Sequence, residues 1–185
     1  MQVPDADALR PTPDRVRETL FNWLEPCLAG ARVLDLFAGS GVLGLEALSR
    51  GAAHATLVDD NPVIGNHLRD TASELRAEGL DVVVADAMAF LRRGERDLFD
   101  VVFVDPPYAY AGYEKLCEVL ESGNLLSARA FVYLELSARR SDRLQMPSSW
   151  ERHRAGRAGE VEFELWRRRG GVSGGNAPVG YAKAD

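Results

Sequence analysis

The chain has 185 residues and a formal net charge of −6 at pH 7, with 46% hydrophobic and 27% charged residues. This length suits one domain with a sizeable core rather than two. The chain contains no run of about 18 apolar residues, so no membrane span is expected. Its first ten residues lack the apolar segment of a secretory signal, which favours a cytoplasmic protein. Cys27 and Cys117 are accordingly expected to be reduced thiols.

The distribution of charge bears on the kind of partner. A net negative charge argues against a protein that coats nucleic acid nonspecifically, because such binding relies on counterion release by many Lys and Arg. Residues 139–169 nevertheless hold nine arginines against five acids, and Arg10, Arg15 and Arg17 form a smaller group. Local arginine patches on an acidic protein suit one specific anionic partner. The alternative is that these arginines belong to solvated strand and helix faces.

The N-terminal part predicts one amphipathic helix. Thr12 is the expected N-cap, and Pro13 stands at the first helical position. Apolar residues then recur at helical spacing, which predicts a helix over residues 13–28. Gly30 is expected to end it.

From residue 32 onwards, predicted strands and helices alternate. Near-continuous apolar runs predict strands over 32–37, 55–58, 80–85, 99–104 and 130–136. Helices are expected over 41–50, 62–78, 87–93 and 112–121. This alternation indicates a mostly parallel sheet that helices cover on both faces. The predicted class is therefore α/β, with a Rossmann-like fold.

The end of the chain follows a different pattern. Residues 150–153 and 160–167 read as strands, and the segment between them, 154–159, contains two glycines and no helix. This pattern predicts an antiparallel hairpin with a loop over 154–159, closing the edge of a seven-stranded sheet. After Arg169 the composition changes to Gly, Ser, Ala and Pro, which is typical of a disordered tail. The expected domain is 1–169, followed by a tail over 170–185.

The turn after the first predicted strand has the form of a nucleotide-binding loop. It reads G-x-G-x-x-G between a strand and a helix, where glycines let the backbone approach a ligand. Dinucleotide oxidoreductases share this pattern. Asp35 at the strand end would repel a pyrophosphate and attract a sulfonium or ammonium, and D-x-F-A-G-S-G is typical of S-adenosylmethionine enzymes. The residues expected to hold this cofactor are Asp35, Phe37, Ala38, Gly39, Ser40, Gly41 and Gly44.

Further acids follow the second and third predicted strands. Asp59 can accept hydrogen bonds from both ribose hydroxyls of the cofactor, and Asp60 can share that role. Asp86 suits the exocyclic amine of adenine, and the Ala87 N–H can reach a ring nitrogen. The alternative for one of the first two acids, and for Asp86, is an N-cap of the helix that follows.

Asp105-Pro106-Pro107-Tyr108 follows the fourth predicted strand and carries the expected chemistry. An aromatic exocyclic amine is a poor nucleophile, because its lone pair is delocalised into the ring. Asp105 and the Pro106 carbonyl can each accept one N–H of such an amine, which directs the lone pair at the methyl donor. The prolines hold these acceptors rigidly, and Tyr108 offers a ring to a planar base. Positioning and electrostatics then favour an in-line methyl transfer. The alternative is a rigid turn after a strand.

These motifs resemble the class I methyltransferases that act on amino groups, and most closely the RsmD-type 16S rRNA guanine-N2 methyltransferases. The specific block reads R-P-T at 10–12 and D-R-V-R-E-T-L-F-N-W-L at 14–24. The likeness continues through L-D-L-F-A-G-S-G at 34–41, G-L-E-A-L-S-R-G at 44–51 and F-V-D-P-P-Y at 103–108. It covers residues from about Leu9 to Arg168.

The resemblance implies methylation of guanine N2 in small-subunit 16S rRNA, at guanine 966, on RNA within a ribosomal subunit or an assembly intermediate. The block at 10–24 is implied to help close the pocket. At its helix start, Thr12 and Arg15 can reach the donor's carboxylate, while Arg10 and Arg17 can meet RNA phosphate. His153 and Arg154 resemble the family's H-R pair, which is expected on the RNA side.

Two other functions stay open. The same fold can methylate adenine N6 or cytosine N4 in nucleic acid, although such DNA enzymes commonly carry a separate recognition domain. A non-catalytic module that only binds the donor is the second. No metal site is expected, because the histidines and cysteines show no ligand spacing. A monomer is the default for a chain of this size.

Overall fold

The computed structural model describes residues 14–94, 98–107, 109–140 and 143–170. Three predicted site residues, Arg10, Thr12 and Tyr108, lie outside the described residues, as does the predicted tail beyond Gly170. The predicted division into a domain over 1–169 and a tail stays a prediction.

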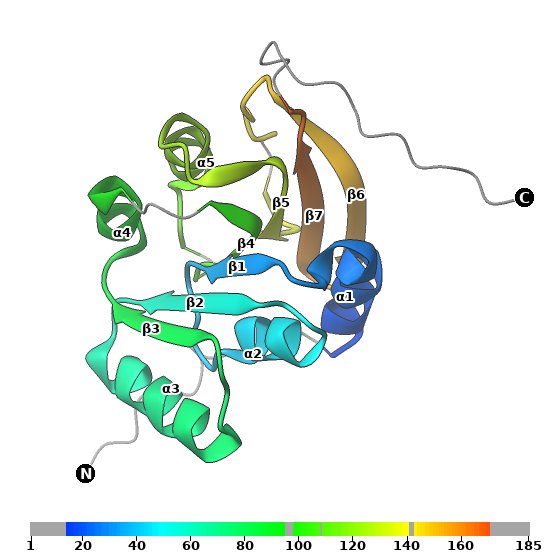
Figure 1. Ribbon diagram of the computed structural model, residues 1–185. Coiled ribbons are helices and arrows are strands. Elements are labelled where there is room, and N and C mark those ends of the chain that lie inside the picture. Colours follow the sequence, from blue (N-terminus) through cyan, green and yellow to red (C-terminus); the bar gives the residue numbers. More distant parts are fainter. Residues whose placement is uncertain (1–13, 95–97, 108, 141–142, 171–185) are drawn as a thin grey trace, which may run out of the picture.

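One seven-stranded sheet organises the protein, in the order β3-β2-β1-β4-β5-β7-β6 (Figure 1). Strands β1 to β5 are parallel to one another, and β7 runs antiparallel to both β5 and β6. The strands are β1 (Arg32–Asp35), β2 (His54–Asp59), β3 (Leu80–Val84), β4 (Phe99–Val104), β5 (Leu126–Ser137), β6 (Trp150–Ala158) and β7 (Val161–Arg168). The helices are α1 (Asp14–Leu28), α2 (Val42–Ser49), α3 (Pro62–Leu75), α4 (Ala87–Arg93) and α5 (Tyr113–Ser122). The predicted α/β class and mostly parallel sheet are confirmed.

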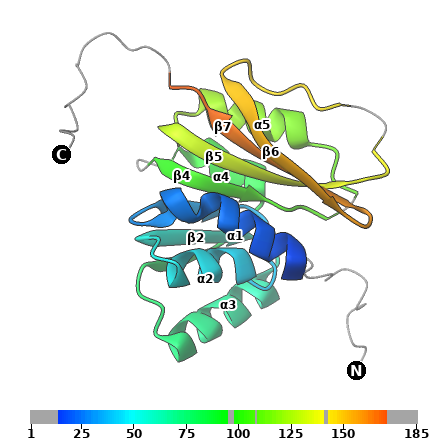
Figure 2. The ribbon, with the colours of Figure 1, turned by 90° about the vertical axis from the view of Figure 1, so that its right-hand side faces the viewer.

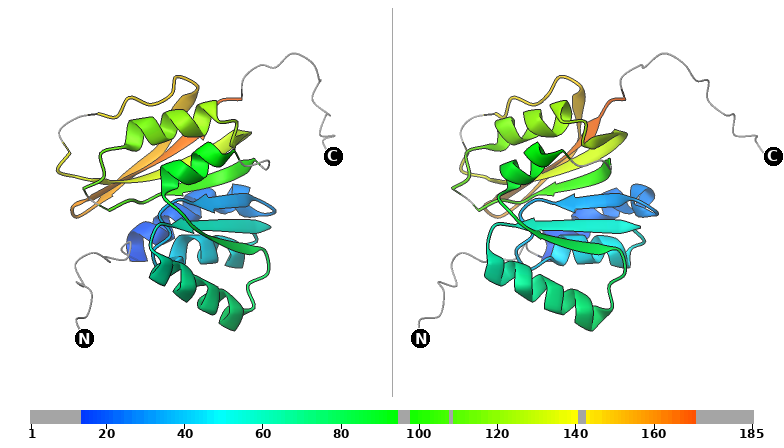
Figure 3. Two further views of the ribbon diagram at one scale, coloured as in Figure 1. Left: turned by 90° about the vertical axis from the view of Figure 1, so that its left-hand side faces the viewer. Right: turned by 60° about the vertical axis from the view of Figure 1, so that its left-hand side comes forward.

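Helices cover both faces of the sheet. α1, α2 and α3 lie on one face, whereas α4 and α5 lie on the other (Figures 2 and 3). Val33 and Val101 pack with α1 and α2, while their chain neighbours Leu34 and Val102 pack with α4 and α5. This alternation is what a strand buried on both sides requires. No helix in the described part of the chain is long and apolar enough to cross a membrane.

The terminal hairpin is present, but the predicted loop over 154–159 is wrong. β6 runs to Ala158 and β7 begins at Val161, so only Gly159 and Glu160 form the turn. Gly159 has the positive φ of 61° that such a tight turn needs. The other glycine, Gly156, lies within the strand. A Cβ there would come within 2.3 Å of the Phe163 ring across the hairpin. Glycine is needed at this position to make room for that ring, and not to form a turn.

Both cysteines are free, as expected. Burial raises the pKa of Cys27 to about 11 and that of Cys117 to about 12. Neither thiol is ionised at neutral pH, so both serve as packing residues.

Candidate active site

Three carboxylates meet at the carboxyl end of the sheet. Asp35 and Asp59 are the last residues of β1 and β2, and Asp105 directly follows β4. The three strands are adjacent and parallel, so their ends share one edge, where ligands bind in open α/β sheets. The negative charges of Asp105 and Asp59 both act on Asp35. The structure thus brings together acids that the sequence separates by up to 70 positions.

Asp35 is buried at this edge of the sheet, with 2% of its surface exposed. Burial, reinforced by the charge of Asp105, raises the pKa of its carboxyl to about 7, against the backbone N–H groups of Phe37 and Gly44 that lower it. Its Oδ1 is buried and has no hydrogen-bond partner within the described residues. A buried carboxylate oxygen without a donor is costly, so this atom points to a cationic or N–H-bearing ligand.

The glycine loop connects the end of β1, at Asp35, to the start of α2. Gly39 and Gly41 have positive φ, and Gly41 precedes the first residue of α2. A Cβ at Gly41 would come within 2.5 Å of the Leu68 side chain, and one at Gly44 within 2.2 Å of Leu57. These two glycines therefore let α2 approach the sheet and α3 closely. At Gly39 a Cβ would meet no side chain, so there the loop leaves room for a ligand.

Asp59 holds the same loop in place. One carboxylate oxygen, Oδ2, accepts a hydrogen bond from the Gly39 N–H at 3.0 Å, and Oδ1 accepts one from the Asn61 N–H at 2.9 Å. Asp60 is exposed. The alternative prediction, that one of these acids caps α3, is wrong. Asn61 is the N-cap, and its side chain accepts a hydrogen bond from the Val63 N–H. The ribose role of Asp59 and Asp60 stays a prediction.

Asp86, the acid predicted to contact adenine, is a helix cap. The side chain of Asp86 accepts a hydrogen bond from the Ala89 N–H at 2.8 Å and is the N-cap of α4, as its alternative interpretation anticipated. Its neighbour Ala87 is buried. The charge of Asp86 also acts on Tyr110, which places it beside the aromatic residues of the site. An adenine contact by Asp86 and Ala87 stays a prediction.

The proline pair after Asp105 forms a rigid corner. Pro106 is buried and Pro107 is exposed. The Tyr110 N–H donates to the Pro107 carbonyl at 2.8 Å. In the glycine loop after β1, Ala38 is buried and its N–H donates to the Val58 carbonyl at 2.9 Å. Ser40 of the same loop is exposed.

Aromatic rings line one side of the site, and only part of them is identifiable from the sequence. Phe37 meets Tyr110 edge to face at 5.2 Å between ring centroids, and Tyr110 meets Tyr113 at 5.3 Å. Burial and then the charge of Asp105 raise the pKa of Tyr113, so its ring lies close to Asp105. Tyr110 and Tyr113 were not predicted as site residues, because Tyr110 lies in a segment without a recognisable pattern and Tyr113 is at the start of a predicted helix, where no sequence signal distinguishes it from a packing residue. Such a wall suits a planar ligand.

A buried polar pair also lies near Asp105. The Tyr133 hydroxyl donates to Glu135 at 3.0 Å, and both side chains are buried. Burial, then the charges of Glu135 and Asp105, raise the pKa of Tyr133 well above its ordinary value. Within a strand, these residues are spaced like ordinary core positions, so no sequence signal marks them as part of a site.

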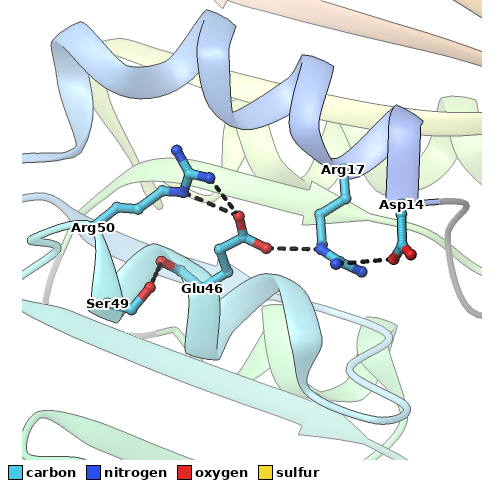
Figure 4. A network of polar contacts seen from close by, with 5 residues as sticks. All are labelled: Asp14, Arg17, Glu46, Ser49 and Arg50. Atoms are coloured by element: carbon cyan, nitrogen blue, oxygen red, sulfur yellow. Dashed lines mark hydrogen bonds and ion pairs between the residues drawn. The ribbon is translucent and has the colours of Figure 1, made fainter.

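The two predicted basic residues of α1 lie in different settings. Arg15 is exposed on the first turn. Arg17 instead pairs with Glu46 of α2 at 2.8 Å and with Asp14 at 2.9 Å, and Glu46 also pairs with Arg50 at 2.7 Å (Figure 4). Arg17 therefore joins α1 to α2 in the structure. Its contact with RNA phosphate, and that of Arg15 with the donor, stay predictions.

His153 and Arg154 lie on β6, the edge strand furthest from β3. The His153 ring meets Phe131 edge to face at 5.4 Å, and Arg154 is exposed. They are several strands away from the carboxylates, so they do not belong to the site itself. No cluster of His, Cys, Asp or Glu that could hold a metal ion occurs among the described residues.

Comparison with known proteins identifies the family. The family model described as Conserved hypothetical protein 95 matches residues 1–167. The chain is 43% identical over 168 residues to ribosomal RNA small subunit methyltransferase D of Escherichia coli K12, covering 91% of this chain and 84% of the relative. The protein of the same name from Haemophilus influenzae is 35% identical over 170 residues, covering 90% and 87%.

Solved structures give the same result for the fold. The Escherichia coli protein yhhF superposes with a TM-score of 0.81 at 40% identity, covering 91% of each chain. The Haemophilus influenzae protein HI0767 does so with a TM-score of 0.77 at 35% identity, covering 86% of this chain and 99% of the other. The predicted class I methyltransferase fold is confirmed. This chain therefore belongs to the Conserved hypothetical protein 95 family, the family of ribosomal RNA small subunit methyltransferase D.

Proposed function

We propose that this protein transfers a methyl group from S-adenosylmethionine to the exocyclic N2 of a guanine in small-subunit 16S rRNA. The observation that carries this proposal is the edge where Asp35, Asp59 and Asp105 meet, with the buried Oδ1 of Asp35 lacking a hydrogen-bond partner among the described residues. An acidic site of this kind favours a cationic ligand and disfavours a pyrophosphate. It therefore supports the methyl donor over a dinucleotide.

The residues present fit that donor. Asp35 would meet its cationic methionine end, and the loop at Gly39 would lie against it without a side chain in the way. Asp59 keeps lone pairs for the ribose hydroxyls beside those that hold the loop, because an ionised carboxylate offers about four acceptor positions. Asp86 and Ala87 would take the adenine edge, while Thr12 and Arg15 are proposed for the carboxylate. Structures of more distant methyltransferases with the same fold contain S-adenosylhomocysteine.

The chemistry falls to Asp105 and its prolines. When bound, S-adenosylmethionine supplies an electrophilic methyl group on a sulfonium. Asp105 and the Pro106 carbonyl accept the two N–H groups of the guanine amine, so the nitrogen lone pair is directed towards that methyl group. The N–CH3 bond would form as the S–CH3 bond breaks and S-adenosylhomocysteine leaves as a neutral thioether, and Asp105, as an acceptor of one N–H, would take the surplus proton from nitrogen. Phe37 and Tyr110 give the planar base an aromatic wall, together with the predicted contact of Tyr108.

The identity of the substrate rests on the relatives. Five relatives that carry the name ribosomal RNA small subunit methyltransferase D match 85% to 91% of this chain. This supports rRNA over DNA as the substrate, in line with the R-P-T-x-D-R-V-R-E segment that general amino-methyltransferases lack. Guanine N2, at position 966, follows from the family resemblance.

The test is to incubate the protein with methyl-labelled donor and three substrates in parallel: small ribosomal subunits, protein-free 16S rRNA and duplex DNA. Label in rRNA, in either form, and none in DNA is the expected result. Transfer to DNA would instead support an adenine N6 or cytosine N4 methyltransferase. Tight donor binding without transfer to any substrate would support a binding module.

A further inference from the structure

One face of the sheet carries a basic and aromatic surface outside the site. α1 packs on part of this face, where Trp23 meets the Phe163 ring at 5.4 Å between centroids, and Figure 2 shows the parts of β5, β7 and β6 that extend past α1. Under α1 this side carries the buried residues Tyr133, Phe163 and Leu165, and past α1 its side chains are more exposed. Five of them form what we call the outer sheet face: Arg129, Phe131, His153, Arg154 and Arg167. Phe131 and Arg167 are opposite each other in the β5–β7 register, and Arg129 lies two residues before Phe131 on the same side.

A β-bulge supplies two of these five side chains. The β6–β7 register shifts between Arg152 and Arg154, so His153 and Arg154 together face Leu165. Without the extra residue, consecutive side chains would point to opposite faces of the sheet. Instead Arg154 shares the side of Leu165, and His153 turns its ring onto Phe131 at 5.4 Å. Bulges commonly re-aim side chains at functional edges, and this one adds a cation to the outer sheet face.

The arginines of this surface have positive charge available for a ligand. Within the described residues, Arg129, Arg154 and Arg167 form no ion pair with a carboxylate within 4.0 Å. On the opposite side of the same strands, Arg152 pairs with Glu164 at 2.9 Å and Arg168 with Glu121 at 2.8 Å. The surface also contains one acid, Glu151, which is opposite Arg167 in the β6–β7 register and pairs with Arg169 at 3.7 Å. Burial lowers the pKa of His153, and the nearby charges of Arg154 and Arg167 lower it further.

We propose that the outer sheet face binds the phosphate backbone of the RNA substrate. An acidic protein of net charge −6 needs a local cationic surface to hold an RNA, and these three arginines around an aromatic pair provide one. Its strands β5, β7 and β6 are the first, second and third beyond β4, so the surface lies about 5 to 15 Å from β4 across the sheet at usual strand spacing. One structured RNA can span that distance and still present a base to Asp105. The proposal rests on the proposed function and extends it to the mode of RNA binding.

The test compares wild type with Arg154→Ala/Arg167→Ala. The matched control is Arg92→Ala/Arg93→Ala, which removes two exposed arginines from α4 on the other face of the sheet. Binding of 16S rRNA, protein-free and in small subunits, is measured at several KCl concentrations. The first variant should weaken binding at least tenfold and flatten the salt dependence by about 0.7 to 0.9 in log–log slope for each phosphate that is no longer neutralised. The control should bind as wild type does, and all three proteins should bind S-adenosylhomocysteine equally.

An unchanged salt slope in Arg154→Ala/Arg167→Ala would overturn the proposal, because neither a structural role nor a protein partner at this face alters counterion release from RNA. Loss of affinity for small subunits but not for protein-free rRNA would overturn it as well, in favour of a ribosomal protein. A wild-type protein that binds rRNA in neither form would refute the proposed function itself, which keeps the two failures distinct.

Discussion

At the residue scale, the proposed donor contact of Asp35 would connect the stability of the protein to donor binding. Its carboxyl has a pKa of about 7 in the folded chain against an ordinary value of 3.8. The folded state therefore holds an extra proton between about pH 4 and pH 7, so this group's contribution to stability falls as the pH rises through that window. A cationic ligand beside Asp35 favours the ionised form and offsets this loss.

Asp35→Asn should consequently raise the melting temperature of the ligand-free protein at pH 8, because no charge is then buried. The same substitution should weaken S-adenosylmethionine binding, and wild-type affinity should rise from pH 6 to pH 8. Thermal melts and calorimetry check both effects. A variant that melts lower than wild type at pH 8 while binding the donor normally would contradict the account of Asp35.

Asp105 is expected to act on the nucleophile rather than on donor binding. Asp105→Ala should reduce methyl transfer about a hundredfold or more while leaving donor affinity within a few-fold of wild type. Asp81→Ala, which removes an exposed acid on β3, is the control and should transfer normally. Turnover of Asp105→Ala at the wild-type rate would remove this residue from the mechanism.

The polar residues of the site were more predictable from sequence than the aromatic ones. Asp35, Asp59 and Asp105 each end a strand, and a strand end is visible in sequence as the point where an apolar run stops. Tyr110 and Tyr133 lack such a signal. One lies in an irregular loop, and the other is spaced like any core residue, so only the folded chain shows that Tyr110 packs on Phe37 and that Tyr133 lies near Asp105.

At the element scale, α1 is held to α2 by the carboxylate of Glu46, which pairs with both Arg17 and Arg50. Glu46→Gln should remove most of that attraction and lower stability by about 1 kcal/mol, or roughly 2–4 °C in melting temperature. The control is Glu118→Gln, which breaks the more exposed pair with Lys115 and should have a smaller effect. Equal effects from the two substitutions would show that the α1–α2 network contributes no more than a surface pair.

The hairpin offers a second test, because Gly156 lies against the Phe163 ring. Gly156→Val would place side-chain atoms where that ring lies, and should cost about 1–3 kcal/mol of stability. Ala155→Val changes the neighbouring exposed position on the other face, and should stay within about 0.5 kcal/mol of wild type. Denaturant unfolding of the two variants gives the comparison. Equal stabilities would contradict the close packing of Gly156 on Phe163.

The helices and strands were predictable where a periodic pattern was strong. α4 and β4 have the predicted limits, whereas α3 ends at Leu75, where Arg76 adopts a left-handed conformation, rather than continuing to Glu78. β5 runs over Leu126–Ser137, longer than the predicted 130–136. The error in the loop over 154–159 came from interpreting both glycines as turn residues. Gly156 is required by a ring on the partner strand, and that pairing is a tertiary contact that local sequence does not encode.

At the scale of the whole molecule, sheet topology places the parts in relation to one another. The order β3-β2-β1-β4-β5-β7-β6 gathers the carboxylates on neighbouring strands and moves the basic hairpin to the far edge. The donor and base sites are thereby separated from the outer sheet face. The alternation of strands and helices predicted the class of fold from sequence alone. The insertion of β7 between β5 and β6 is a long-range pairing that the pattern of a hairpin does not specify.

The central claim, transfer of a methyl group to guanine N2 in rRNA, is tested most directly by the chemical identity of the product. 16S rRNA, protein-free and in small subunits, is incubated with the protein and labelled S-adenosylmethionine, digested to nucleosides and analysed by mass spectrometry, with Asp105→Ala in parallel. The account predicts N2-methylguanosine as the labelled product, strongly reduced in the variant. N6-methyladenosine or N4-methylcytidine as the only labelled product would contradict it.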